Sequence, residues 1–282
     1  MIKLISFSLY GQIKKYTYGA IENAKLAKVF YPDWKVRFYI NSTVPNDIIL
    51  KLKDLEVEII DMTNSKIPGV YWRFLPMDDK NIDVFISRDV DCRLSSREAG
   101  AVQQWLESGK AFHTMHDHKR QTETVLAGQW GFINSFKGSI CIEKMIYDFC
   151  EQKGFNFTYG DDQIFLKKLY GTFTNNTFDH CFAPINMPNC VILPNKEKDD
   201  YFIGTVFDHK NKQIKNKINL LSADIKHSKI RLATASYIGE FGEFLKPKFP
   251  NLFLILKKHG EKLVWIDILL KLITEESKTL TN

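Results

Sequence analysis

The chain has 282 residues, 44% of them hydrophobic and 26% charged, which is enough apolar material for one large α/β domain with its own core. This composition excludes a disordered or fibrous protein, and no apolar run reaches the length of a membrane-spanning helix. The net charge of +6 suits an anionic partner such as a nucleotide diphosphate, a membrane surface or nucleic acid, and equally a solvated basic surface.

The cysteines suggest a reducing environment. Their number, five, is odd, and no C-x-x-C spacing occurs, so we expect reduced thiols instead of a disulfide framework or a zinc knuckle. Residues 1–7 are too short an apolar run for a signal peptide. We therefore expect a cytoplasmic protein.

The first third of the chain alternates strand and helix patterns. Apolar, β-branched runs predict strands at residues 3–9, 35–40 and 57–60, and helical spacing predicts helices at residues 19–30 and 45–55. This βαβαβ order indicates a parallel sheet covered by helices on both faces.

The next elements lead to the polar motifs. An aromatic stretch at residues 71–75 is expected to be helical, and the apolar run at residues 83–87 is typical of a central strand. Ser95 and Glu98 resemble a capping box that opens a helix, which Gly109 ends.

The second half contributes a strand at residues 111–115, helices at about 139–152 and 162–170, and a last strand-like piece at 202–207. From about residue 224 the sequence becomes basic and aromatic, and it ends in an apolar helix at residues 262–273. We expect a main domain at residues 1–222 and a helical extension at residues 223–282. The extension either packs as a final helix or presents a surface to a membrane or partner.

Two acids follow the expected strand at residues 83–87. In an extended segment, residues two apart point to the same side, so Asp89 and Asp91 could meet one divalent cation. Ligands of open α/β sheets lie beyond the carboxyl ends of strands, where these acids are expected. The alternative is a solvated acidic turn. We favour a Mn²⁺ or Mg²⁺ site that would neutralise a diphosphate.

Arginines accompany this acidic pair. Arg88 and Arg93 flank it, and Arg73 lies upstream in the aromatic stretch. Guanidinium groups near paired acids either pair with them or bind phosphate oxygens in bidentate fashion. Both interpretations stay open for Arg88 and Arg93, and ligand binding is favoured for Arg73.

Residues after the strand at 111–115 offer sugar contacts. The His-x-x-His-x-His spacing at residues 113–118 does not match the usual zinc ligands, so we expect Asp117 and His118 to bind sugar hydroxyls. Trp130 lies between glycines, and its indole could stack on a sugar face or belong to the core.

The tetrad YGDD at residues 159–162 also occurs in the metal-binding hairpin of viral RNA polymerases. Here helical spacing continues from Gln163, which places Asp161 and Asp162 at a helix N-terminus and not between two strands. One of them is then catalytic or an N-cap. A polymerase would also need a much longer chain, so we expect no nucleic-acid partner.

His209 follows the last strand-like piece. It is either a returning metal ligand or phosphate contact, or a lone surface histidine. Asp208 beside it is an equally good candidate.

Several motifs occur in a fixed order: YWRFLP at 71–76, RDVDCRLS at 88–95, the helix around 105–106, FHTMHDH at 112–118, GQWG at 128–131 and GDDQIFL at 160–166. Together they resemble a group of small GT-A glycosyltransferases, similar to enzymes of bacterial surface polysaccharide synthesis and of large viruses. The resemblance covers roughly residues 1–210.

The resemblance implies a GT-A fold, which is a Rossmann-like α/β fold with a mostly parallel sheet flanked by helices. It also implies a nucleotide-sugar donor and a Mn²⁺ or Mg²⁺ ion at the D-x-D motif. The positions carried over are Ser6, Phe7 and Leu9 near the base and ribose, Arg73 near the nucleotide, Asp89 and Asp91 at ribose and metal, Asp117 and His118 at the donor sugar, and Asp162 on the acceptor side.

The working hypothesis is glycosyl transfer to a glycan or other hydroxyl acceptor, with Asp162 deprotonating the acceptor or stabilising the cationic sugar. A second hypothesis is an inactive nucleotide-sugar or polysaccharide-binding protein, docked at a membrane through the basic C-terminal helices. A third is a nucleotidyltransferase, which would release pyrophosphate from a nucleoside triphosphate.

Overall fold

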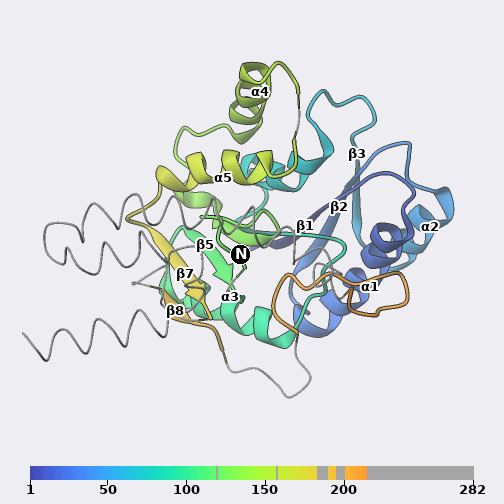
Figure 1. Ribbon diagram of the computed structural model, residues 1–282, viewed down its shortest axis with the longest axis horizontal. Coiled ribbons are helices and arrows are strands. Elements are labelled where there is room, and N and C mark those ends of the chain that lie inside the picture. The colour runs from blue at the N-terminus through green and yellow to red at the C-terminus, as the bar shows by residue number, and fades with distance from the viewer. Residues whose placement is uncertain (119, 157, 183–189, 195–200, 215–282) are drawn as a thin grey trace, which may run out of the picture. The chain divides into compact units, whose positions relative to one another are not determined.

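In the computed structural model, which describes residues 1–118, 120–156, 158–182, 190–194 and 201–214, an eight-stranded sheet forms the centre (Figure 1). Its strands are β1 (Lys3–Leu9), β2 (Lys35–Ile40), β3 (Glu58–Asp61), β4 (Val84–Arg88), β5 (Phe112–His116), β6 (Gln129–Ile133), β7 (Thr177–Cys181) and β8 (Val191–Ile192). Their order is β3-β2-β1-β4-β6-β5-β7-β8. Strand β6 is antiparallel to β4 and β5, and the other pairs are parallel.

The helices are α1 (Lys14–Phe30), α2 (Asn46–Asp54), the 3₁₀ helix η1 (Gly69–Asp78), α3 (Ser96–Ser108), the 3₁₀ turn η2 (Asn134–Phe136), α4 (Ile142–Gln152) and α5 (Asp161–Gly171). Helix α3 has the predicted ends. The Glu98 amide donates to Ser95 Oγ over 3.2 Å, and Gly109 ends the helix with a φ of 66°.

Helices cover both faces of the sheet, as predicted for the α/β class. Along β4, Phe85 faces the core layer under η1, α4 and α5, whereas Val84 and Ile86 face the layer under α1, α2 and α3. This period-two alternation is what a strand buried on both faces requires. Figure 1 shows α4 and α5 on one side of the sheet and α3 on the other.

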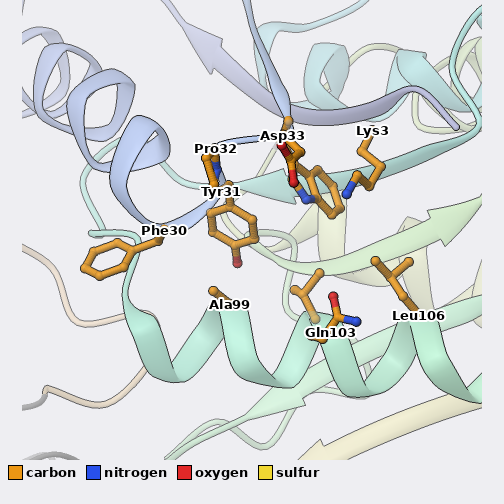
Figure 2. Close-up of a pocket in the computed structure, with 10 residues that line it drawn as sticks. Lys3, Phe30, Tyr31, Pro32, Asp33, Ala99, Gln103 and Leu106 are labelled. Atoms are coloured by element: carbon orange, nitrogen blue, oxygen red, sulfur yellow. The ribbon is translucent and has the colours of Figure 1, made fainter.

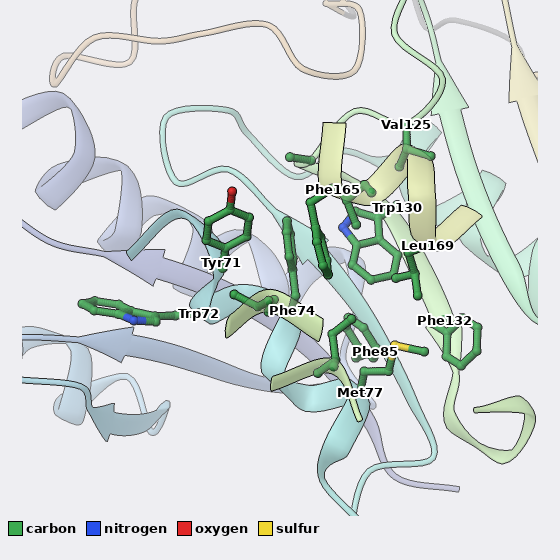
Figure 3. Close-up of a cluster of buried hydrophobic side chains, with 14 of the residues drawn as sticks. Tyr71, Trp72, Phe74, Met77, Phe85, Val125, Trp130, Phe132, Phe165 and Leu169 are labelled. Atoms are coloured by element: carbon green, nitrogen blue, oxygen red, sulfur yellow. The ribbon is translucent and has the colours of Figure 1, made fainter. Parts of the chain in front are cut away.

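Aromatic rings fill the layer under η1 and α5 (Figure 3). Phe74 of η1 meets Trp130 of β6 edge to face at 5.3 Å and stacks on Phe165 of α5 at 6.3 Å between ring centroids. Burying each ring contributes roughly 1.5–3 kcal/mol. This layer therefore fixes η1 and α5 against the sheet.

Some elements differ from the sequence-based expectations. No strand was predicted around Trp130, where the antiparallel strand β6 forms, and strands β7 and β8 were not predicted either. Residues 202–207 form no strand but contribute the isolated bridge between Phe207 and Gln213. The predicted extension at residues 223–282 lies outside the described residues.

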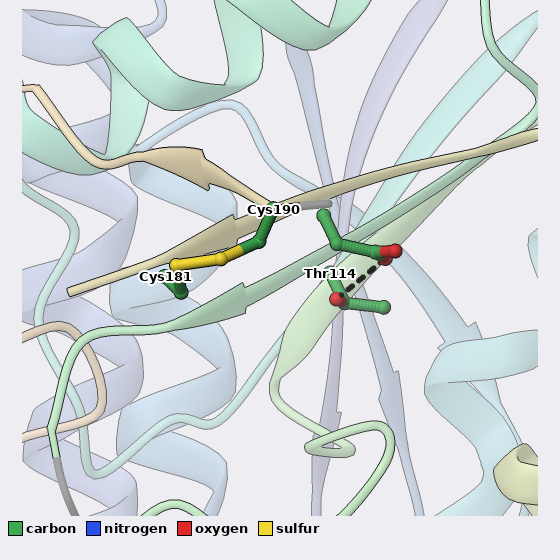
Figure 4. Close-up of a disulfide and its surroundings, with 4 residues drawn as sticks. Thr114, Cys181 and Cys190 are labelled. Atoms are coloured by element: carbon green, nitrogen blue, oxygen red, sulfur yellow. Dashed lines mark hydrogen bonds between the residues drawn. A yellow bond between two sulfur atoms is a disulfide. The ribbon is translucent and has the colours of Figure 1, made fainter. Parts of the chain in front are cut away.

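The expectation of reduced thiols is wrong for one pair of cysteines. Cys181, the last residue of β7, forms a disulfide with Cys190, which precedes β8 (Figure 4). The parallel pairing of β7 with β8 brings the two residues to a Cα–Cα distance of 5.9 Å, within the range that a disulfide spans. Cys92, Cys141 and Cys150 are free thiols.

No helix in the described ranges combines the length and the apolar character needed to cross a bilayer.

Candidate active site

The candidate site lies where three neighbouring strands bring polar residues to one edge of the sheet. Because β1 and β4 are parallel, Tyr10 and Asp89 follow their carboxyl ends at the same edge. Antiparallel β6 begins there, and Arg88 pairs with Gln129. A Cβ at Gly128 would overlap the Asp89 carboxylate, so only glycine lets this backbone approach the acid so closely.

Arg73 joins two acids that are far apart in sequence. Its Nη1 donates to Asp89 Oδ1 over 2.6 Å, and its Nη2 donates to Asp162 Oδ2 over 3.1 Å. The Arg73 amide donates to Ser8 Oγ over 3.0 Å, which ties η1 to the end of β1. Arg73 therefore brings the D-x-D motif and the start of α5 into one site.

Asp91 has a different cationic partner. Lys15 of α1 donates through Nζ to Asp91 Oδ2 over 2.8 Å, and its Nζ lies 4.4 Å from the Tyr16 ring centroid. The Asp91 carbonyl accepts from the Phe207 amide over 2.8 Å. Residues from α1 and from the segment after residue 200 thus meet at Asp91.

Negative charge accumulates at this edge. Burial raises the pKa of Asp89, the carboxylates of Asp91 and Asp162 raise it further, and Arg73 opposes them. Burial alone would lower the pKa of the Arg73 guanidinium, but the same acids outweigh it and hold that pKa raised. The three carboxylates of the site therefore carry more negative charge than their two basic partners, Arg73 and Lys15, balance.

The donor set fits a divalent cation that completes its shell with substrate oxygens. No group of three or more histidine, cysteine or acidic side chains in the described ranges is arranged to hold a metal. Mg²⁺-type ions, however, are commonly bound by one or two carboxylates together with phosphate oxygens and water. Asp89 and Asp91 are the two carboxylates at this site that could serve such an ion, and Arg73 and Lys15 supply their positive charge in this structure.

The two acids before Gln163 have different surroundings. Asp161 is buried, and its carboxylate accepts from the Thr158 amide over 2.8 Å and pairs with Lys153. It therefore holds the turn before α5 from the first turn of the helix. The N-cap of α5 is Gly160, which makes no side-chain cap hydrogen bond, so the N-cap alternative raised by the sequence is wrong. Asp162, in contrast, belongs to the site because its carboxylate accepts a hydrogen bond from Arg73.

Several predicted contact residues are buried. Ser6, Phe7 and Leu9 are inside the sheet layers, so their side chains do not reach a base or ribose; Tyr10, 43% exposed, is the residue of this strand end that does reach solvent. Trp130 is a core residue and not a platform for a sugar.

Arg88 is also internal. Its Nε donates to Glu98 over 2.6 Å, and its Nη1 donates to the carbonyls of Ser87 and Trp130. Of the two interpretations that the sequence left open, ion pairing describes Arg88.

Asp117 is buried, and groups of the protein occupy its carboxylate. Both of its oxygens accept from Arg97, over 2.7 and 3.0 Å, and Oδ2 also accepts from the Ile203 amide over 2.9 Å. His118 stacks on Phe202 at 4.5 Å between ring centroids. A sugar contact by His118 stays a prediction.

The remaining histidines do not form a zinc site in the described ranges. His113 hydrogen-bonds His180 over 2.9 Å inside the protein, and His116 bonds the Glu123 carbonyl over 2.8 Å. Burial lowers the pKa of both His113 and His116. His209 lies edge-on to Tyr18 of α1, with ring centroids 6.2 Å apart, and its metal role stays a prediction.

Sequence reasoning missed Lys15, Tyr10 and the close approach of Gly128. The Gly-Gln-Trp-Gly motif predicted a close approach of the backbone to a bound ligand. In the structure the backbone at Gly128 instead approaches the Asp89 side chain. Lys15 lies in a helix start without any recognisable motif, and its partner Asp91 is 76 residues away.

Cavities occur elsewhere on the molecule. One of about 140 Å³ lies beside Lys3 at the start of β1, between the end of α1 and α3 (Figure 2). Another, of about 450 Å³, is lined by α1, by residues 93–96 and by residues from 201 to 211. Arg73, Asp89 and Asp162 line neither of these two cavities.

No protein-family model matches the sequence, and a comparison with curated proteins finds no match. Solved structures share part of the architecture. The galactosyltransferase LgtC, in complex with donor and acceptor sugar analogs, has 16% identity and a TM-score of 0.43, covering 64% of this chain and 73% of its own.

Two further solved structures have similar values. Glucosyl-3-phosphoglycerate synthase from Mycobacterium tuberculosis, in complex with Mn²⁺, UDP-glucose and phosphoglyceric acid, has 10% identity and a TM-score of 0.42, covering 70% of this chain and 72% of its own. The mannosyltransferase PcManGT from Pyrobaculum calidifontis, with GDP-mannose and Mn²⁺, has 10% identity and a TM-score of 0.40, covering 61% and 52%. At these values the assignment of function rests on the site itself.

Proposed function

We propose that this chain is a metal-dependent GT-A glycosyltransferase that moves a sugar from a nucleotide-sugar donor to a hydroxyl of a glycan or other acceptor. The observation that carries the proposal is the double ion pair of Arg73 with Asp89 and Asp162. It joins the D-x-D acids to the acid at the start of α5, at the sheet edge where α/β proteins bind ligands.

The D-x-D acids are assigned to the cation. Asp89 and Asp91 would hold a Mn²⁺ or Mg²⁺ ion, which supplies a Lewis acid for the charge that develops on the leaving diphosphate. The Lys15 side chain pairs with Asp91 and is 30% exposed, and its ammonium group would be a second positive charge for the oxygens of that diphosphate. Both cationic groups favour departure of the nucleoside diphosphate.

Asp162 is assigned to the acceptor side. Its Oδ2 is held by Arg73 and its Oδ1 accepts from the Gln163 amide over 3.0 Å, which fixes the orientation of the carboxylate. In that position Asp162 accepts the proton of the acceptor hydroxyl or stabilises the positive charge on the sugar.

The test is release of nucleoside diphosphate from nucleotide sugars in the presence of Mn²⁺, with and without simple glycan acceptors. We expect turnover by the wild type and a loss of about 10²- to 10⁴-fold in Asp162→Asn. Asp148→Asn removes a carboxylate that pairs with Lys144 on α4 and serves as the matched control, with turnover retained. Donor binding without any diphosphate release would instead identify a binding protein.

A further inference from the structure

One segment crosses from the end of β5 to the D-x-D loop. We name residues 201–214 the strap; it is drawn in orange in Figure 1, beside α1. Its first anchor is Ile203, whose amide donates to Asp117 Oδ2 over 2.9 Å and whose carbonyl accepts from Gln121 Nε2 over 2.7 Å. At the next residue, Gly204, a Cβ would overlap the amide of Gln129, so the strap lies directly on the start of β6.

The second anchor is the D-x-D loop itself. The Phe207 amide donates to the Asp91 carbonyl over 2.8 Å, and the Arg93 guanidinium carbon lies 5.2 Å from the Phe207 ring centroid. Arg93 Nε also donates to Asn211 Oδ1 over 2.9 Å, and Asn211 in turn donates to Glu22 of α1 over 3.0 Å. The strap therefore connects Asp91 to β5 and to α1.

The ion pair beneath the first anchor is buried. The side chains of Arg97 and Asp117 are 8% and 2% exposed, and Arg97 also donates to the Pro194 carbonyl. Removing one partner of such a pair leaves an uncompensated charge in the interior. Only a few residues separate Ile203 from Phe207, so a displacement of the first anchor is transmitted along the chain to Asp91.

We propose that Asp117 is a positioning residue which, together with Arg97, holds the strap against the D-x-D loop and thereby sets the geometry of the cation site. The strap part of this inference stands on the contacts above. The cation part rests on the proposed function. Asp117 acts through Ile203 and Phe207 on Asp91, as outer-shell groups act on the ligands that they orient.

Hydrogen exchange of the purified full chain, followed by mass spectrometry, tests the strap. In Asp117→Asn we expect peptides covering residues 201–214 to exchange about tenfold faster, because the buried pair that holds them is lost. Gly204→Ala should have the same effect from the strap side, since its φ of 91° and the contact with Gln129 exclude a Cβ. This second variant keeps the ion pair and guards against misfolding of Asp117→Asn.

Glu98→Gln is the matched control. It breaks the other buried ion pair of α3, that of Arg88 with Glu98, and should leave exchange in the strap unchanged. Strap exchange in Asp117→Asn and Gly204→Ala no faster than in Glu98→Gln would overturn the inference.

The second measurement is Mn²⁺ binding by electron paramagnetic resonance of the free ion. We expect the dissociation constant for Mn²⁺ to rise about tenfold in Asp117→Asn and in Gly204→Ala. An unchanged constant beside faster strap exchange would refute the positioning role. Absence of Mn²⁺ binding in the wild type would count against the proposed function alone, because the exchange experiment needs no metal.

Discussion

Replacing Arg73 by methionine removes the guanidinium group that separates Asp89 from Asp162. The variant keeps the length and apolar stem of the side chain but leaves these two acids and Asp91 without that positive charge. The structure predicts two consequences, a loss of stability and a gain in the response to divalent cations.

The loss of stability follows from the exposure of the partners. Arg73 and Asp162 are 10% and 15% exposed, close to the buried pairs whose disruption costs about 3–5 kcal/mol. Asp89 is 38% exposed, so water screens its pair with Arg73. Loss of that pair should cost about 0.2–1 kcal/mol, as for surface pairs. We expect a total of about 3–6 kcal/mol, which corresponds to a fall in Tm of roughly 6–24 °C for a domain of this size.

Arg37→Met is the matched control. Arg37 is 11% exposed and also bridges two acids, Glu58 and Asp79, over 2.7 and 2.8 Å, but it lies on β2 away from the site. Arg37→Met should lose less stability than Arg73→Met in thermal unfolding, because Glu58 and Asp79 are 36% and 23% exposed. Saturating Mn²⁺ should restore part of the Tm in Arg73→Met, because the cation supplies the missing positive charge, and should shift Arg37→Met no more than the wild type. Equal Mn²⁺ shifts in the two variants would refute this reasoning.

Two further predictions concern stability away from the acids. Burial and Arg97 lower the pKa of His180 to about 4, because the folded protein favours the neutral ring. The unfolded chain therefore binds a proton more readily than the folded protein. The folded protein is fully stable with respect to this group above the ordinary histidine pKa and loses stability as the pH falls below it. Urea unfolding should show that stability falls between about pH 6.5 and 4, with His180 contributing about 3 kcal/mol of the loss. The loss should therefore be smaller in His180→Gln, and an equal loss in both proteins would contradict the assignment. Asp78 accepts from the Ile142 and Glu143 amides, each over 3.0 Å, at the start of α4. Asp78→Ala should cost about 1 kcal/mol and speed hydrogen exchange in the first turn of α4, whereas unchanged exchange there would show that the cap is dispensable.

Local signals predicted much of the fold. The strand at residues 3–9 and the end of β4 before Asp89 follow from apolar runs, and the start and end of α3 follow from Ser95 and Gly109. These features depend on residues close in sequence, which is why a pattern reveals them. The placement of the D-x-D acids at the carboxyl edge of the sheet has the same origin.

The features that the sequence did not predict depend on contacts between residues that are far apart in the sequence. No local pattern predicted a strand around Trp130, and β6 forms there through its pairing with β4 and β5. Cys181 and Cys190 meet because β7 and β8 pair. Likewise Asp117 has the chemistry of a sugar ligand, but Arg97, 20 residues before it, occupies its carboxylate.

The central claim is a cation-dependent nucleotide site at Asp89 and Asp91. Its most direct test is the Tm of the wild type and of Asp91→Ala with nucleoside diphosphates and nucleotide sugars, with and without Mn²⁺, because a ligand of the native state raises the Tm by mass action. We predict stabilisation by one class of nucleoside diphosphate that requires Mn²⁺ and is lost in Asp91→Ala. Stabilisation by no nucleotide, or stabilisation that persists without Mn²⁺ and in Asp91→Ala, would contradict the claim.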